Sequence, residues 1–310
     1  DQLKDSEGKP LTARQIPGRG TAYAILAGVY AWIAGYGQEP EYYALGIEAA
    51  GKVIGDPNYR LVASPEEVCT EVLPGNSEEG IFEVCYDDSR GEYKDFGSYI
   101  GGTVEKWPVL KGTTPASRRK FFIRNETVER LYTPEDLRLQ AYFADFFRMK
   151  EEPVSVTQGA AYIRMWREVE YYSGGIYDGT PRTLLANDIL IRLPDILLLR
   201  AEMRAATGDR EGAVADLDVV RRRAGVAGYS EAEGDLRRAI QLERDRELLF
   251  QTGVRYFDYM RNHTYNLLKG GFRDLTEADV AAGALFLPVS LDAMNNNPKV
   301  KQTAYWVGKF

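Results

Sequence analysis

The sequence contains few of the residues that metal and acid–base chemistry usually require. Its 310 residues include one histidine and two cysteines, and no CxxC pair, HExxH motif or histidine cluster occurs. It also has no run of five Lys/Arg residues and no apolar run near the roughly 20 residues that span a bilayer. Together with a formal net charge of -7, this argues against a general nucleic-acid binder. We expect neither a cofactor nor a metal.

Targeting signals are absent as well. The first thirty residues lack the basic-then-apolar layout of a signal peptide, and the chain does not begin with Met. We therefore expect a trimmed piece of a longer protein, whose location the missing signals do not reveal. Residues 1–16 are polar and without periodicity, which predicts a linker before a single domain over residues 17–310.

The few cysteine and histidine residues have ordinary structural interpretations. Cys69 and Cys85 could form a disulfide in an oxidising compartment, but two buried free thiols fit the sequence equally well. His263 follows an Arg-Asn pair that ends a predicted helix. We therefore expect it at the surface or at a helix cap rather than as a catalytic base.

Aromatic and apolar residues are abundant by contrast. The chain has 20 Tyr, 12 Phe and 4 Trp, and 44% of its residues are hydrophobic, which is enough for a substantial core. Residues 21–55 carry small and apolar side chains at helical spacing in two stretches separated by a Gly/Pro break. This pattern predicts a helix hairpin.

A second hairpin is predicted over residues 194–225. Pro194 cannot lie inside a helix, so the first helix should begin there, after an extended segment, and Gly208 should end it. Asp209 can cap the next helix, which Gly225 should end. Two helices of this length, with small residues where they cross, have the layout of a tetratricopeptide unit.

The middle of the chain is less regular. Residues 80–86 alternate like a short strand, whereas residues 87–180 are rich in Gly, Tyr and charge. Within that region, residues 133–147 predict a helix capped by Thr133, and residues 161–172 predict a strand. The expected fold class is therefore mainly α, with tetratricopeptide-like helix hairpins, long irregular loops and a few short strands.

One further helix, predicted over residues 235–251, carries two carboxylates on its apolar stripe. Glu243 and Glu247 lie in line with apolar positions one and two turns earlier, so they need partners to offset the cost of desolvation. Arg244, Arg255 and Arg261 are close enough in sequence to supply them. Alternatively, two carboxylates about 6 Å apart could serve a retaining glycosidase, if they faced an open cleft.

Four motifs in order carry a resemblance to a known family. They are IRLPDILLLRAEM, GDREGAVADLDVVRRRAGV, LERDRELLFQTGVRYFDYMR and LFLPVSLDAMNNNPKVKQTAYW. In this order they resemble the C-terminal part of the SusD/RagB family of outer-membrane nutrient-binding lipoproteins. The matched segments cover residues 189–306, and the likeness extends back to about residue 20. The chain departs from the family pattern at Pro194, at Asp218, where Asn is usual, and around Gln251.

The resemblance implies a fold, a role and a location. The fold would be a SusD-like α-α superhelix, in which the helix of Glu243 and Glu247 is structural and the closing segment 285–310 packs against the body. The role would be non-catalytic capture of glycans or peptides and their delivery to a SusC-like TonB-dependent transporter. The protein would be anchored to the extracellular face of the outer membrane through a lipidated N-terminal cysteine that this chain lacks.

Candidate ligand-binding residues are exposed aromatics in the irregular, variable region 87–180, because an aromatic plane can receive the apolar face of a sugar ring. Trp107 is the first choice, since the following proline fixes the backbone that presents it. Tyr99, Tyr93 and Phe96 could add further platforms, and Lys106 and Arg90 could reach hydroxyls or an acidic group. Any one of these aromatics could instead anchor its loop.

A second aromatic cluster lies beside two glycines near the end of this region. Tyr172 and Tyr177 are its exposed candidates, whereas Trp166 falls in the predicted strand and is assigned to the core. Asp87, Asp88 and Asp178 could hold Ca²⁺, but the DxDxDG spacing is missing. Two other functions remain open: a tetratricopeptide-like scaffold for peptides or proteins, and a glycoside hydrolase.

Overall fold

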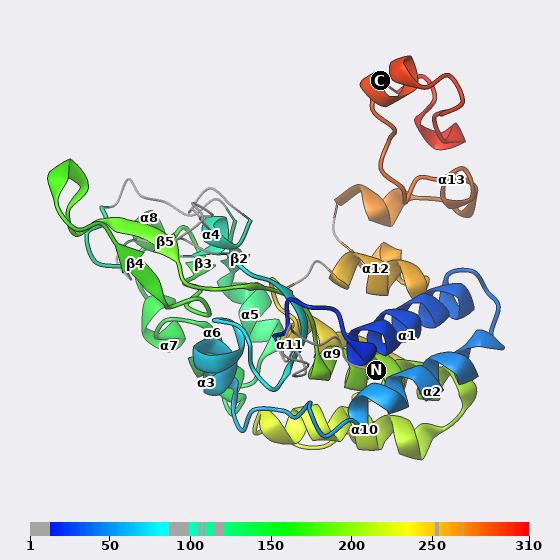
Figure 1. Cartoon of the computed structure of the whole chain (residues 1–310), viewed down its shortest axis with the longest axis horizontal. Helices are drawn as coiled ribbons and strands as arrows, with labels where there is room; N and C mark the ends of the chain where they lie inside the picture. The colour runs from blue at the N-terminus through cyan, green and yellow to red at the C-terminus, as the bar shows by residue number, and fades with distance from the viewer. Residues whose placement is uncertain are drawn as a thin grey trace, which may run out of the picture.

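A computed structural model describes residues 13–86, 99–104, 107, 110–114, 121–251, 254–268 and 270–309. Helices dominate these residues, and the strands among them are short (Figure 1). The predicted fold class is confirmed. None of the helices in the described residues has both the length and the hydropathy needed to cross a membrane.

The body of the molecule is a stack of antiparallel helices. In order along the chain they are α1 (Arg19–Gly35), α2 (Tyr42–Ile54), α9 (Leu193–Thr207), α10 (Arg210–Arg223) and α11 (Leu236–Glu247). α2 lies between α1 and α9, and α9 also contacts α10 and α11. Two helix hairpins that are far apart in sequence therefore form one stack (Figure 1).

Small residues set the close spacing within this stack. Ala24, Ala27, Ala31 and Ala34 form the buried face of α1, at the spacing of one helical stripe. Gly46 of α2 faces the next helix so closely that an added Cβ would lie 2.4 Å from the sulfur of Met203. The hairpins can therefore pack face to face only because these positions lack larger side chains.

The helix boundaries around α9 and α10 follow from local chemistry. Pro194 lies in the first turn of α9, and Gly208 ends the helix with a left-handed φ of 87°, a conformation that glycine adopts without strain. The side chain of Asp209 then accepts a hydrogen bond of 2.9 Å from the backbone N–H of Gly212. These residues act as the sequence predicted.

Three pairs of short antiparallel strands accompany these helices in the part of the chain that the structure describes. β1 (Gly80–Val84) pairs with β6 (Asp188–Arg192), with irregular register at two points. β2 (Ile123–Arg124) pairs with β3 (Ala160–Ala161), and β4 (Val169–Tyr171) pairs with β5 (Pro181–Leu184). The strand expected over residues 161–172 is therefore correct only at its two ends.

The helix expected over residues 133–147 is wrong as a single element. It forms two short helices, α6 (Leu137–Tyr142) and α7 (Phe146–Met149), and Asp136 rather than Thr133 caps the first. The break lies at Phe143, which is extended and pairs with Ile163 in an isolated β-bridge. A tertiary contact thus overrides the helical pattern.

The remaining helical segments are short. They are α3 (Pro65–Glu67), a π turn (Val68–Val72), α4 (Tyr99–Thr103), α5 (Asn125–Leu131), α8 (Val154–Thr157), α12 (Val254–Arg261), α13 (Glu277–Ala281) and α14 (Leu291–Asn296), with 3-10 turns at Gly175–Tyr177, Glu231–Glu233, Tyr265–Leu267, Gly270–Asp274 and Ala304–Trp306. Helices α3 to α8 and strands β2 to β5 form a lobe beside the helical stack (Figure 1).

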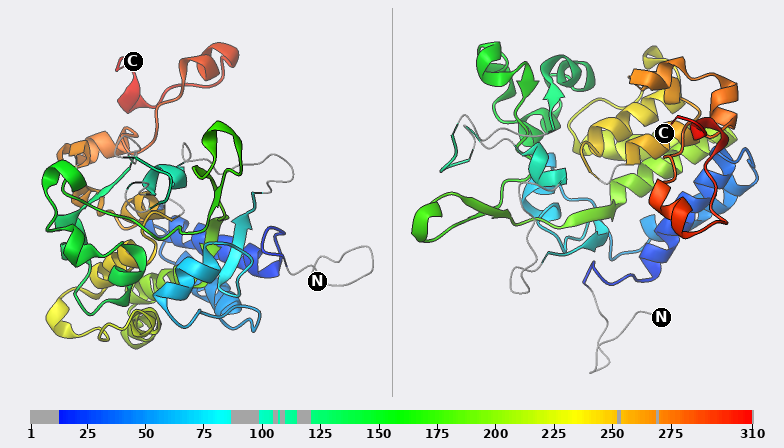
Figure 2. Two further views of the ribbon diagram at one scale, coloured as in Figure 1. Left: turned by 90° about the vertical axis from the view of Figure 1, so that its left-hand side faces the viewer. Right: turned by 90° about the horizontal axis from the view of Figure 1, so that it is seen from above.

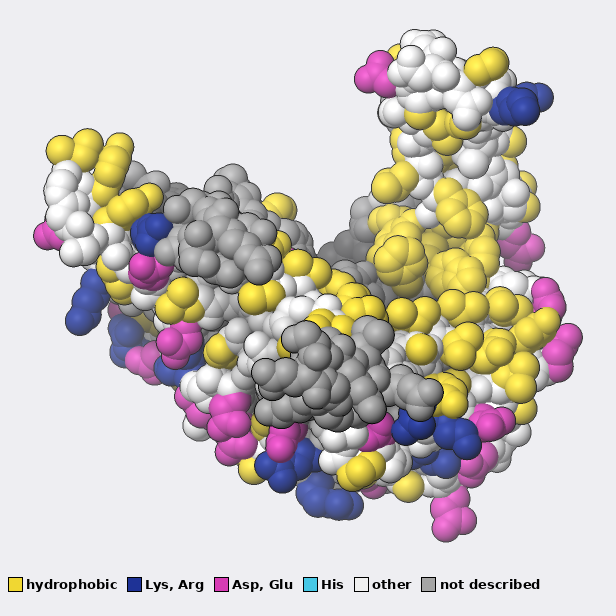
Figure 3. Space-filling model, viewed as in Figure 1, with side chains coloured by type: hydrophobic (Ala, Val, Ile, Leu, Met, Phe, Trp, Pro, Cys, Tyr) yellow, Lys and Arg dark blue, Asp and Glu magenta, His cyan; other side chains and the backbone are white. Residues whose placement is uncertain are grey.

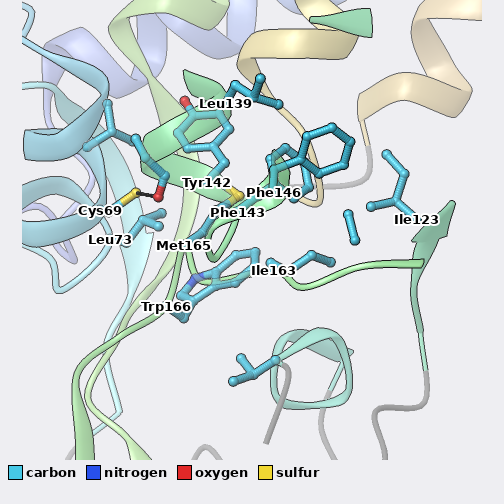
Figure 4. Close-up of a cluster of buried hydrophobic side chains, with 14 of the residues drawn as sticks. Cys69, Leu73, Ile123, Leu139, Tyr142, Phe143, Phe146, Ile163, Met165 and Trp166 are labelled. Carbon is cyan, nitrogen blue, oxygen red and sulfur yellow. Dashed lines mark hydrogen bonds between the residues drawn. The ribbon is translucent and has the colours of Figure 1, made fainter. Parts of the chain in front are cut away.

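This lobe has its own hydrophobic core. Tyr142, Phe143, Met165 and Trp166 are buried together in it (Figure 4). Cys69 lies in the same cluster and donates a weak hydrogen bond of 3.6 Å to the carbonyl oxygen of Ala141. The assignment of Trp166 to the core is confirmed.

The C-terminal residues 285–309, called the arm here, extend away from the helical stack (Figure 1, Figure 2). At its base, Leu285 is buried beside Tyr259 and Met260 of α12, and Phe286 lies edge-on to Tyr36, the residue after α1. Farther along, the indole N–H of Trp306 donates to the carbonyl oxygen of Phe286 at 2.6 Å. The arm is therefore joined to the body mainly at its base, unlike the closing segment that the resemblance implied.

Candidate functional site

The two carboxylates of α11 are sealed inside the molecule. Glu243 and Glu247 are fully buried, and each contacts three arginines. Neither carboxylate is accessible from the surface, because side chains from the lobe, the helical stack and β6 surround both of them. The pair is therefore part of the core and not of a cleft.

Arginines from three different elements surround Glu247. Arg192 of β6 approaches its Oε1 at 2.6 Å, Arg138 of α6 approaches its Oε2 at 3.2 Å, and Arg223 at the end of α10 also contacts Oε1. Glu79 then bridges Arg192 at 2.8 Å and Arg223 at 2.9 Å. The network joins the lobe to the helical stack.

These charges decide the protonation state of Glu247. Burial alone would raise its pKa, but attraction to Arg223, Arg192 and Arg138 outweighs burial and lowers the pKa to about 2. Burial likewise acts to raise the pKa of Glu243, and Arg138, Arg246 and Arg221 lower it on balance. Both residues are therefore carboxylates at neutral pH and cannot supply the proton that a glycosidase acid must donate.

The predicted pairing of these carboxylates with neighbouring arginines is wrong. Arg244 contacts Asp195 and Asp258, each at 2.7 Å, because adjacent positions on a helix point in different directions. Arg255 pairs with Asp245, and Arg261 pairs with Glu202 and Asp258. The principle that buried charges on this helix are paired is confirmed, but the partners come from distant parts of the chain.

The connection between β4 and β5 presents an exposed aromatic pair. The side chains of Tyr172 and Tyr177 are 42% and 60% exposed, and their ring centroids lie 5.7 Å apart at an angle of 40°. Ile176, between them in sequence, is 91% exposed. This apolar tip stands at the outer end of the lobe (Figure 1).

Backbone hydrogen bonds hold this tip in shape. The N–H of Tyr172 donates a hydrogen bond to the carbonyl oxygen of Thr180. The N–H of Gly179 donates another to the carbonyl oxygen of Tyr172, and both distances are 2.9 Å. The carboxylate of Asp178 accepts a hydrogen bond of 2.6 Å from the N–H of Gly174, which has a left-handed φ of 83°. The two rings are therefore presented on a defined turn, so fewer degrees of freedom would be lost on binding.

The first-choice aromatic segment is described only in part. Trp107 is half-buried in a turn after α4. Tyr99 begins α4, but its side chain lies outside the described residues. Arg90, Tyr93, Phe96, Lys106, Asp87 and Asp88 also fall outside the described residues. Whether these residues gather around Trp107 stays a prediction.

The other chemically notable residues have structural surroundings. Cys69 is a buried free thiol and Cys85 an exposed one, so the expectation that both free thiols would be buried is wrong for Cys85. His263 is exposed, and its Nε2 lies 3.1 Å from the carbonyl oxygen of Gly35, as expected of a surface residue at a helix end. Among the residues that the structure describes, no three His, Cys, Asp or Glu side chains gather as a metal site.

A cleft that no sequence motif indicates lies where the lobe meets the helical stack. Its volume is about 580 Å³, and it lies between α5, α11 and α12. Several arginines line it together with leucines. These arginines come from segments that are far apart in sequence, so no local motif could have shown that they share a cleft.

Comparison with known proteins identifies relatives of the whole fold. The model of the SusD family matches residues 78–306. A SusD homolog from Bacteroides thetaiotaomicron has a similar structure, with 22% sequence identity and a TM-score of 0.79, and the match covers 98% of this chain and 63% of that one. This chain therefore spans less than two thirds of the length of that protein.

Two other solved structures are similar. A SusD superfamily protein from Bacteroides fragilis has 15% identity and a TM-score of 0.70, with 97% of this chain and 67% of that one covered. The surface glycan-binding protein A from Bacteroides thetaiotaomicron, in complex with laminarihexaose, has 20% identity and a TM-score of 0.66, with 98% and 66% covered. None of the curated protein sequences compared with the chain matches it.

Proposed function

The chain belongs to the SusD family, and from this premise we propose that it is a non-catalytic nutrient-binding protein that captures oligosaccharides. It would hold them on the extracellular face of the outer membrane and deliver them to a SusC-like TonB-dependent transporter. In this proposal a lipid on an N-terminal cysteine, outside this chain, anchors the protein. A structural neighbour that binds laminarihexaose supports the choice of glycans as the ligand class.

The observation that carries the proposal is the exposed pair Tyr172 and Tyr177, presented on a fold of this family. Sugar rings have an apolar face that stacks on aromatic planes, and the polar edges of the ring remain free for hydrogen bonds. The side chain of Arg182, on the neighbouring strand β5, pairs with Glu170 at 2.9 Å. Both residues belong to the strand pair that leads into the turn with the two rings.

Trp107 is proposed as a second stacking platform. It is half-buried, so one face of the indole can be packed while another part stays accessible. Under this proposal Tyr99, Tyr93 and Phe96 extend the aromatic surface, and Lys106 and Arg90 contact hydroxyls or acidic groups. A fixed indole before a proline loses little freedom on binding.

The sealed state of Glu243 and Glu247 supports binding without hydrolysis. A glycosidase needs one protonated and one ionised carboxyl group on either side of the scissile bond. Here both groups are buried among arginines. Burial acts to raise the pKa of Glu247, but attraction to the arginines outweighs burial and lowers the pKa to about 2. No role in turnover is therefore proposed for this pair.

A second candidate function, a tetratricopeptide-like scaffold for proteins, is favoured by one specific observation. Ile25, Leu26 and Val29 form an exposed apolar face on α1, and α1 has no charged residue after Arg19. Figure 3 shows hydrophobic side chains gathered over α1 and over the base of the arm. Contiguous apolar surface of this kind is typical of protein contacts.

Two parallel screens separate these functions. The purified chain is applied to a glycan array and to a peptide library, and we expect saturable binding on the array only. For any glycan that binds on the array, titration calorimetry compares the affinity of the parent with those of Tyr177→Ala and Trp107→Ala. Loss of one stacking platform should weaken binding by about 1 to 3 kcal/mol, by analogy with stacking of bases on aromatic side chains.

Phe147→Ala is the matched control, because Phe147 is an exposed aromatic of the same lobe on α7. Equal affinities for the parent, Tyr177→Ala and Trp107→Ala would place the site elsewhere. Binding to peptides without binding to any glycan would favour the scaffold instead.

A further inference from the structure

The cleft where the lobe meets the helical stack has a ligand-sized volume of about 580 Å³, within the range of small-molecule sites. α5 forms one wall, and α11 and α12 form the other, with the 3-10 turn Gly270–Asp274 beside them. α11 contacts both α5 and α12. Of the stacking residues proposed above that the structure describes, Trp107, Tyr172 and Tyr177, none lines this cleft.

Positive charge dominates the lining of the cleft. Among the residues that the structure describes, five arginines and two aspartates line it, in a chain whose net charge is -7. Two of these arginines are neutralised, since Arg244 contacts Asp258 at 2.7 Å and Arg255 contacts Asp245 at 2.9 Å. The other three have no ion pair among the described residues; they are Arg130, Arg238 and Arg273.

Arg238 is held in place by neutral groups. Its Nη1 donates to the amide oxygen of Gln241 at 2.7 Å and to the hydroxyl of Tyr259 at 3.3 Å. The guanidinium carbon lies 5.7 Å from the centroid of the Tyr259 ring. Neither contact neutralises the charge, so a positioned guanidinium with further N–H donors remains for an anion.

Most of the rest of the described cleft lining is apolar, and Thr127 and Gln251 are its other polar residues besides Tyr259. Its apolar residues include Leu242 of α11, Leu248 and Leu249 just after α11, Val254 of α12 and Leu267. A ligand for this cleft must therefore combine an anionic group with a face that tolerates contact with aliphatic side chains. A sugar ring that carries an acidic substituent has both features.

We propose that this cleft binds an acidic sugar unit of an oligosaccharide, with Arg238, Arg130 and Arg273 contacting its carboxylate or sulfate. The sugar ring lies against the leucines, and the charged group is directed to the arginines. This inference rests on the proposed capture of oligosaccharides and names the class that the protein prefers. A guanidinium binds carboxylate and sulfate through paired N–H donors, so both sources are compatible with the site.

Titration calorimetry with three probes tests the inference. They are trigalacturonic acid, which carries carboxylates, a sulfated carrageenan tetrasaccharide, and laminarihexaose, which is neutral. We expect at least one acidic probe to bind at least tenfold more tightly than laminarihexaose, and its affinity to fall as salt increases. The acidic probe that binds identifies the source of the anion.

Three variants locate the binding. Arg238→Gln and Arg273→Gln each remove one charge from the cleft. We expect each variant to bind the acidic probe at least fivefold more weakly than the parent and to bind laminarihexaose with unchanged affinity. Arg222→Gln is the matched control, because Arg222 is exposed at the end of α10 and does not line the cleft. If Arg238→Gln unfolds, exposed Arg273 still provides the test.

The failures are distinguishable. If laminarihexaose binds but neither acidic probe binds more tightly, the inference is overturned and glycan capture stands. The inference is also overturned if Arg222→Gln lowers the affinity for the acidic probe as much as the cleft variants do. If no oligosaccharide binds to the parent, the proposed function itself fails.

Discussion

Replacing Glu247 by alanine removes the carboxylate at the centre of the buried charge network. In the parent, this carboxylate contacts Arg138, Arg192 and Arg223. After the substitution, Glu79 is the one carboxylate among the described residues that still contacts Arg192 and Arg223, at 2.8 and 2.9 Å. Two buried guanidinium groups then depend on one carboxylate, and a small cavity is left beside them.

The structure sets the expected size of the effect. The pKa of Glu247 is lowered from 4.5 to about 2, which corresponds to about 3 kcal/mol of favourable interaction with the folded protein. Removing one partner of a buried ion pair typically costs about 3 to 5 kcal/mol. We expect the lower end, because Arg138 retains contacts with Asp136 at 2.8 Å and Glu243 at 2.7 Å.

Urea denaturation followed by circular dichroism measures the change in the free energy of unfolding. Glu48→Ala is the control: its carboxylate pairs with Lys52 on the surface of α2 at 3.8 Å, and such pairs contribute between about 0 and 1 kcal/mol. A Glu247→Ala variant as stable as Glu48→Ala that no longer binds a glycan would refute the structural role of this carboxylate.

The remaining predictions concern acid, thiols and a helix cap. Because the folded pKa of Glu247 is below its usual value, its contribution is present above pH 4.5 and is lost as the pH falls to about 2; the free energy of unfolding measured against pH should therefore decline across this window. Burial raises the pKa of the Cys69 thiol to about 12, so Ellman's reagent should modify exposed Cys85 quickly and Cys69 only in denaturant. Two thiols reacting at one rate in the native protein would contradict this. Asp209→Ala should reduce the free energy of unfolding by about 1 kcal/mol in urea titrations, whereas Asp209→Asn keeps the cap and should change it little.

The helical stack could be predicted from the sequence because its signals are local. Pro194, Gly208 and Asp209 each act on backbone within a few residues of themselves, and the structure shows the predicted helix start, stop and cap. Phe143 shows where such reasoning ends, since pairing with Ile163 breaks a well-patterned helix. Nothing near Phe143 in sequence signals that contact.

Partners that are distant in sequence escaped prediction for the same reason. Glu247 lies among arginines, as its sequence position indicates, but Arg138 and Arg192 come from the lobe and from β6, more than fifty residues away. The cleft arginines Arg130 and Arg238 are likewise on different helices. The glycines near Tyr177 predict a surface turn, and Tyr177 is exposed as expected. Its role in binding stays a prediction.

We expect this protein to bind oligosaccharides without hydrolysing them. Isothermal titration calorimetry tests both halves at once, with laminarihexaose, trigalacturonic acid and a sulfated carrageenan tetrasaccharide injected in turn into the purified chain. We expect saturable heats for at least one of them, with the signal returning to the baseline after every injection. Absence of binding heat for all three, or a sustained heat flow that grows with oligosaccharide concentration and reports turnover, would contradict it.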